Sequence, residues 1–347
     1  MKESATLLRQ PVDRASRIVA LDLLDAAAKQ RTRLDNKRNT EALHDFRVGV
    51  RRLRSWLRAL DPWLADSVPG KARRRLKRAA RATNASRDAD VRLVWLREQR
   101  PNLNASERRG LNWLIKRISS DRDEAFNADV KRGARAFDRA NRRLDKTLRE
   151  YRVHIDEDED DSARLFDVIL GGLMRDHSAD LSRRLSAIHT IANARQIHVA
   201  RISAKRLRYL IDPLSDSIPG VTEFVSELGK LQDALGESHD VALFAEELEK
   251  ISALRDAKDP RLTPGLVAVR ERLRAHADEL FSQVSQWLAG DASALIERVD
   301  TIADALSPRR HRKLELVREA ADASRVVTPD AAITLHSDAQ IADLAPQ

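Results

Sequence analysis

The stretch HDFRVGVRRLRSWLRAL, residues 44–60, has the pattern of a strongly two-sided helix. At 100° per residue, five basic side chains fall within an arc of about 80°. This first basic stripe consists of His44, Arg47, Arg51, Arg54 and Arg58. The opposite side of the helix carries the apolar residues Phe46, Val50, Leu53, Leu57 and Leu60. One face therefore suits a protein core, and the other suits an anionic partner.

The alternative for this basic face is an ordinary solvated surface, which is what most charge runs form. A solvated helix usually alternates acidic and basic residues four positions apart, because such pairs attract each other. No acidic residue lies between Asp45 and Asp61. The like charges therefore repel one another, and an anionic ligand would remove that repulsion.

Composition predicts a folded and almost entirely helical protein. The 347 residues could form two domains of common size, and 42% hydrophobic with 34% charged residues is typical of a folded chain. Only 11 Gly and 11 Pro interrupt a sequence dominated by the helix formers Ala, Leu and Arg. The absence of cysteine excludes a disulfide framework and a thiolate metal site.

The N-terminal sequence lacks an apolar signal core, and nowhere do eighteen apolar residues follow one another. We therefore expect a cytoplasmic protein without a membrane partner.

Charge is unevenly distributed along the chain. Residues 1–155 hold 39 basic and 20 acidic side chains, whereas residues 156–347 hold 24 and 34. Of the 63 basic residues, 50 are Arg, whose planar guanidinium binds phosphate oxygens in pairs. Codon usage in a GC-rich genome is the alternative explanation for this preference. The basic first half indicates a polyanionic partner.

The chain repeats itself on either side of the acidic run DEDEDD at 156–161. Six residues of the opening stretch recur 154 positions later; they are His198, Arg201, Lys205, Arg206, Leu207 and Arg208. The turn DPWLADSVPG at 61–70 resembles DPLSDSIPG at 212–220, and residues 76–91 align with residues 228–242. The second basic stripe is thus His198, Arg201, Lys205 and Arg208.

Hydrophobic periodicity predicts about four helices in each half, followed in the second half by two more. The expected helices of the first half are 12–36, 41–60, 70–86 and a long stretch through 105–150 that breaks near Ser119 or Gly133. Those of the second half are 162–191, 195–211, 220–237, 239–256, 264–288 and 292–306. Short loops marked by Pro or Gly favour antiparallel neighbours, hence helical bundles.

The motifs H-x-x-R-V-x-x-R-R-L-R, H-x-x-R-x-x-x-K-R-L-R-Y and R-D-A-D-V resemble those of the conserved histidine α-helical domain (CHAD) family. The resemblance covers residues 8–306. It implies an all-α fold of two pseudo-symmetric antiparallel bundles, of about four helices each, around a basic central groove or pore. It also implies binding of inorganic polyphosphate, targeting to polyphosphate granules and no catalytic activity of its own.

On this basis we expect bundle 1 at about 8–150, an acidic linker at 154–163 and bundle 2 at 164–306. Residues 307–347 are polar without a sustained period, and we expect a flexible tail.

The motif positions of the family fall on both basic stripes, which the resemblance therefore assigns to polyphosphate. Arg58 extends the first stripe, and a helix at 71–81 adds further basic residues within about 100°. These are Arg74, Lys77, Arg78 and Arg81, and Lys230 is the one basic echo of this face in the second half. Departures from the family pattern are Ala85-Ser86 and His239, which bear on loop geometry.

Catalysis and metal binding have no candidate residues. His44 and His198 lack a second histidine or carboxylate at the spacing that a metal needs, so each either donates to phosphate or makes a structural hydrogen bond. Asp88, Asp90 and Asp240 are interpreted as helix caps or arginine partners. No cofactor is expected, and the oligomeric state stays open. The alternative function is a basic helical nucleic-acid binder, which a pI near 10.0 also suits.

Overall fold

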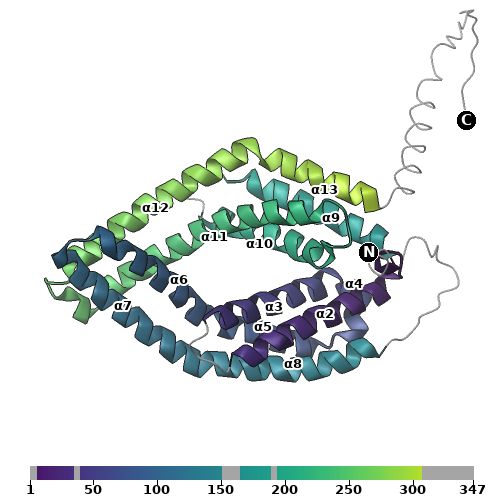
Figure 1. Cartoon of the computed structure of the whole chain (residues 1–347), viewed down its shortest axis with the longest axis horizontal. Helices are drawn as coiled ribbons and strands as arrows, with labels where there is room; N and C mark the ends of the chain where they lie inside the picture. Colours follow the sequence, from purple (N-terminus) through teal and green to yellow (C-terminus); the bar gives the residue numbers. More distant parts are fainter. Residues whose placement is uncertain (1–5, 35–39, 151–164, 189–193, 307–347) are drawn as a thin grey trace, which may run out of the picture. The chain divides into compact units, whose positions relative to one another are not determined.

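The computed structural model describes residues 6–34, 40–150, 165–188 and 194–306 (Figure 1). The helices of the first half are α2 (Val12–Arg33), α3 (Thr40–Ala59), α4 (Asp61–Leu64), α5 (Gly70–Ala82), α6 (Asn84–Gln99), α7 (Ala105–Ala125), the π-helix η3 (Phe126–Val130) and α8 (Lys131–Arg149). Those of the second half are α9 (Phe166–Leu185), α10 (Ala194–Ile211), α11 (Val221–Ser252), α12 (Thr263–Gly290) and α13 (Ala292–Leu306). No strand occurs within the described ranges, and the predicted all-α class is confirmed.

Short 3₁₀ turns connect several of these helices; they are η1 (Ala65–Ser67), η2 (Arg100–Asn102), η5 (Asp212–Leu214) and η6 (Arg255–Lys258). Both the predicted linker at 154–163 and the predicted tail at 307–347 lie outside the described residues.

Two predicted helix boundaries are wrong. The chain after residue 70 forms two helices separated at Thr83, whose hydroxyl donates to the Ala80 carbonyl at 2.9 Å. The predicted boundary near 238 does not exist: α11 continues unbroken for 32 residues, and within it the Ser238 hydroxyl donates to the Ala234 carbonyl at 3.0 Å. The long 105–150 stretch is interrupted by η3, and α8 begins at Lys131, close to the predicted break near Gly133.

Helix α3 turns its apolar side inward, as its sequence predicts. Phe46 and Val50 are fully buried, and the Phe46 ring meets the edge of Phe137 on α8 with centroids 5.2 Å apart. Trp56 is equally buried and donates its indole N–H to the Ser16 carbonyl on α2 at 2.9 Å. Packing against α2 and α8 thus fixes the rotation of α3, and with it the direction of the first basic stripe.

The two halves of the sequence share their cores. The Trp56 ring packs on Phe166 of α9 at 6.1 Å between centroids, and the Phe166 N–H donates to the Gln10 carbonyl at 2.9 Å. A second apolar cluster joins α6 and α7 of the first half to α11 and α12 of the second, at one end of the helical arrangement in Figure 1. The division into two pseudo-symmetric bundles stays a prediction.

Glycines allow a close crossing within this second cluster. A Cβ on Gly110 would lie 2.8 Å from the Cα of Gly265, so α7 and α12 touch through their backbones. None of the described helices is long and apolar enough to cross a membrane.

Candidate anion-binding site

Arg47 is the most buried member of the first basic stripe, with 9% of its surface exposed. Its guanidinium lies 3.4 Å from an Asp88 carboxylate oxygen and donates to the Thr83 carbonyl at 3.4 Å. Burial, followed by repulsion from Arg51, lowers the pKa of Arg47 to about 10. Arg47 therefore anchors the stripe to the junction between α5 and α6.

The other arginines of this stripe have much freer side chains. Arg51 and Arg54 are half-buried, Arg58 is exposed, and none of the three forms a hydrogen bond or ion pair with another described residue. Burial lowers the pKa of Arg54, and the neighbouring charges of Arg58, Arg51 and Arg81 lower it further. The guanidinium groups of these three arginines and of Arg81 thus lie near one another and have no partner among the described residues.

The second basic stripe, on α10, repeats the anchor of the first. Arg201 lies 3.5 Å from Asp240, and this pair occupies the positions that the internal repeat assigns to Arg47 and Asp88. Both aspartates lie inside helices, so they are arginine partners, and the capping alternative does not apply to them. Asp90 is a partner as well, because Arg122 donates to it at 3.0 Å.

Lys205 is the point at which the two stripes meet. Burial is the largest cause that lowers its pKa, to about 7, and the charges of Arg201, Arg51 and Arg47 add to the shift. Two of these arginines belong to α3, which contacts α10 directly. The first stripe therefore faces the second closely enough to favour the neutral form of its lysine.

One ion pair crosses between the halves beside the stripes. Arg52 lies 2.7 Å from Asp212, the residue directly after α10. The repeat-related Arg206 does not form the corresponding bond, since Asp61 is paired with Arg73. The ion pair between the halves therefore forms only once, although the sequence repeat supplies both of its residues twice.

Two glycines of α11 make room for arginines of the second stripe. A Cβ on Gly236 would lie 3.4 Å from the Arg201 Nε, and one on Gly229 would lie 3.5 Å from an Arg208 nitrogen. Arg208 also donates to the Gln232 side chain at 3.4 Å. The sequence did not lead us to predict this arrangement, although Gly229 and Gly236 are seven residues apart, as are Arg201 and Arg208.

The motif histidines differ between the two stripes. His198 Nδ1 lies 3.0 Å from His239 Nε2, whereas His44 has Arg87 at the equivalent position. Burial, followed by nearby arginine charge, lowers the pKa of all three histidines. They are therefore neutral at pH 7 and offer one donor and one acceptor each.

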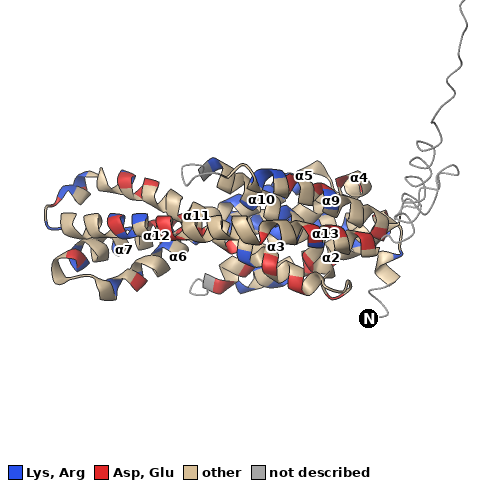
Figure 2. Ribbon diagram, turned by 90° about the horizontal axis from the view of Figure 1, so that it is seen from above, with Lys and Arg blue, Asp and Glu red and all other residues tan. Residues whose placement is uncertain are grey.

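The remaining predicted site residues lie at different places. Arg81 contributes its charge beside Arg54, whereas Arg78 lines a separate pocket between α5 and α8. The side chains of Arg74, Lys77 and Lys230 are exposed. Lys and Arg, drawn in blue in Figure 2, gather along α5 and α10. No cluster of three or more potential metal ligands occurs among the described residues.

The described residues thus define a class of all-helical proteins that carry matching basic stripes on two repeated helices, α3 and α10. The CHAD domain family model matches residues 19–249, and the chain belongs to this family. A comparison with curated proteins gives no match.

Two solved structures share the fold. The CHAD domain from the plant Ricinus communis has a TM-score of 0.60 at 19% identity, over 86% of this chain and 93% of that one. PptA from Streptomyces chartreusis has a TM-score of 0.60 at 15% identity, over 80% of this chain and all of its own.

Proposed function

We propose that the two basic stripes form a single binding site for inorganic polyphosphate, in a basic groove between α3 and α10. The observation that carries this proposal is the direct contact between α3 and α10, which brings arginines of the first stripe close enough to lower the pKa of Lys205 in the second. Repulsion between the like charges of the two stripes destabilises the free protein, and a bound polyanion relieves that cost.

Polyphosphate suits this chemistry because it is a linear polyanion with no bases to recognise. Only charge, hydrogen-bond donors and the shape of the site can select it. The site supplies arginine forks that take phosphate oxygens in pairs, the single N–H of the neutral His44, and one further N–H from the hydrogen-bonded pair of His198 and His239. Binding releases counterions from the polymer, so we expect affinity to fall steeply with salt concentration, as it does for nucleic acids.

The role that we infer is binding without catalysis. Membership of the CHAD family supports residence at cytoplasmic polyphosphate granules, with polyphosphate as the partner. Asp88 and Asp240 are paired with arginines of the stripes, which leaves these two carboxylates unsuited to act as a general base.

A competition titration tests this proposal against nucleic-acid binding. Labelled long-chain polyphosphate is bound to the protein and displaced by unlabelled polyphosphate, by DNA and by RNA at equal phosphate concentration. We expect polyphosphate to compete far better than either nucleic acid. Equal or better competition by DNA or RNA would contradict the proposal and favour the nucleic-acid alternative.

A further inference from the structure

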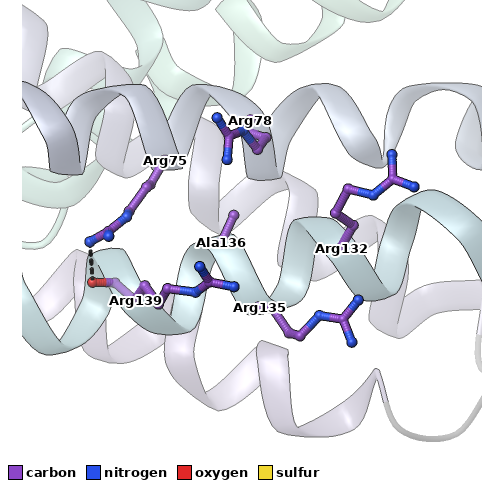
Figure 3. A pocket seen from close by; sticks show the side chains of 6 residues that line it. All are labelled: Arg75, Arg78, Arg132, Arg135, Ala136 and Arg139. Atoms are coloured by element: carbon purple, nitrogen blue, oxygen red, sulfur yellow. Dashed lines mark hydrogen bonds between the residues drawn. The ribbon is translucent and has the colours of Figure 1, made fainter.

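A separate arginine-lined pocket lies between α5 and α8. Its volume is about 130 Å³, and its lining consists of Arg75, Arg78, Arg132, Arg135, Ala136 and Arg139. Figure 3 shows the side chains of Arg78 and Arg139 on either side of Ala136. No carboxylate lines this pocket, which makes it unlike the anchored stripes of α3 and α10.

The pocket follows from how closely the two helices pack. Arg132, Arg135 and Arg139 are spaced three and four residues apart, so they share one face of α8. A Cβ on Gly133 would lie 2.7 Å from the Cβ of Ala82, which means that only glycine allows α8 to come this close to α5. The close approach brings arginines of both helices around one small cavity.

The arginines of the pocket have few partners to neutralise them. Arg75 donates to the Arg139 backbone carbonyl at 3.3 Å, and Arg132 lies 3.4 Å from Asp129. The side chains of Arg78, Arg135 and Arg139 form no hydrogen bond or ion pair with any described residue.

Acidic residues are also scarce in the surrounding helices. Asp138, beside Arg139 in sequence, is paired with Arg31 of α2 at 3.1 Å. Helix α5 contributes seven basic residues and no acidic one. Repulsion among the pocket arginines is therefore left for a ligand to offset.

We propose that this pocket is a second anion site, distinct from the basic stripes, that takes a compact phosphate anion of one or two phosphoryl groups. Its volume is well below the roughly 300–1,000 Å³ of pockets for drug-sized ligands. Guanidinium forks arranged around a small cavity match the oxygens of a phosphate, which they bind in pairs. A free diphosphate and the end of a polyphosphate chain both present this chemistry.

The alternative is that α8 merely exposes a solvated basic surface. Arg142 and Arg143 continue on the same helix, are exposed and do not line the pocket. They carry the same charge on the same helix and therefore provide a matched control.

Site-resolved modification tests the proposal on the full chain. Phenylglyoxal reacts with accessible arginines, and its rate at each residue is measured by peptide mass spectrometry with and without inorganic diphosphate. We expect diphosphate to slow modification of Arg78, Arg135 and Arg139 several-fold, and to leave Arg142 and Arg143 unchanged. Equal protection of the two groups, or protection of neither, would overturn the proposal.

Neutral variants supply a second, independent readout. R135Q/R139Q removes two forks, and we expect roughly ten-fold weaker diphosphate binding by calorimetry, compared with little change for R142Q/R143Q. Equal weakening in both variants would show a diffuse basic surface and would overturn the site. Because the protection at Arg135 does not involve the stripes, it persists even if the stripes fail to bind polyphosphate.

The same modification assay separates the two sources of the ligand. Polyphosphate with free ends is compared with polyphosphate whose terminal phosphates are esterified. Protection of Arg135 by the free-ended polymer alone supports capture of a chain end in the pocket, and protection by diphosphate alone supports a free anion. Equal protection of Arg135 by the esterified and the free-ended polymer, without protection by diphosphate, would exclude a site for compact anions.

Discussion

The two basic stripes share the same arginine–aspartate anchors, but their other arginines differ in how many partners they have within the protein. Arg47 and Arg201 hold equivalent aspartates at 3.4 and 3.5 Å. Beyond these anchors, the first stripe presents three arginines without a partner among the described residues, whereas Arg208 is bonded to Gln232 and packs over Gly229. The first stripe therefore provides most of the available charge, whereas the arginines of the second stripe make more contacts within the protein.

The helices that carry the aspartate partners of Arg47 and Arg201 also differ between the two halves. In the first half the chain breaks at Thr83, and the Thr83 carbonyl becomes an acceptor for Arg47. In the second half α11 continues through the equivalent position, and its glycines lie against the arginines. A repeated sequence has thus produced one open and one tightly packed version of the same arrangement.

The largest effect is expected from charge reversal in the first stripe. R51E/R54E removes two unpartnered forks, each worth about 1.5–3 kcal/mol as charge-assisted hydrogen bonds, so polyphosphate affinity falls by at least about 100-fold. Helical content by circular dichroism should stay unchanged, because neither side chain supports the core. R108E/R109E, an equal charge change on α7, is the control. An R51E/R54E protein that unfolds would show that the stripe is structural.

Reversal in the second stripe should have a smaller effect. K205E/R208E alters a lysine that is only partly charged at pH 7 and an arginine that is already bonded to Gln232. We expect roughly ten-fold weaker polyphosphate binding by the same titration. A loss as large as that of R51E/R54E would contradict the inequality of the stripes.

The pH dependence of binding reports on Lys205. In the protein without ligand, Lys205 has a pKa of about 7. A bound polyanion favours the charged form of this lysine, so binding takes up a proton above pH 7. Affinity should therefore fall as pH rises from about 7, and calorimetry in buffers of different ionisation enthalpy should detect the uptake. The variant K205R stays charged and should remove both effects. Unchanged pH dependence in K205R would refute this assignment.

The same shift affects stability without a ligand. Because the pKa of Lys205 is lower in the folded chain than its ordinary value of 10.5, the folded state binds fewer protons between about pH 7 and 10.5. The free energy of unfolding should rise with pH across that window, to an extent that K205M reduces. Thermal melts at fixed ionic strength measure it.

The smallest effect concerns the glycines that accompany the second stripe. A Cβ at Gly229 would meet Arg208 at an ordinary contact distance of 3.5 Å, and alanine favours a helix interior over glycine by about 1 kcal/mol. G229A should therefore raise the melting temperature slightly and leave polyphosphate affinity unchanged. A loss of affinity would mean that Arg208 must move over Gly229 in order to bind.

The sequence predicts the helical class, the repeat and the inward face of α3, because these depend on local periodicity. It predicts the paired anchors only as one of two interpretations of Asp88 and Asp240. It fails at Thr83 and Ser238, where similar backward hydrogen bonds accompany a break in one half and a continuous helix in the other. Local propensity does not separate these outcomes, which depend on packing between distant helices.

The α5–α8 pocket could not be predicted either. The arginine spacing on α8 is visible in the sequence, but its meeting with α5 depends on Gly133, whose neighbours are distant in the chain. For the same reason Arg78 is brought to this pocket.

Both stripes are proposed to bind the same polyphosphate chain, and the protonation of Lys205 reports directly on that binding. The titration of Lys205 is followed by NMR of ¹³C-labelled lysine, assigned with K205R, in the full chain and in R51E/R54E as polyphosphate is added. We predict that polyphosphate raises the pKa of Lys205 in the full chain and that this response requires far more polyphosphate in R51E/R54E. A response in R51E/R54E at the same polyphosphate concentration would show that the stripes bind independently, and would contradict the single site.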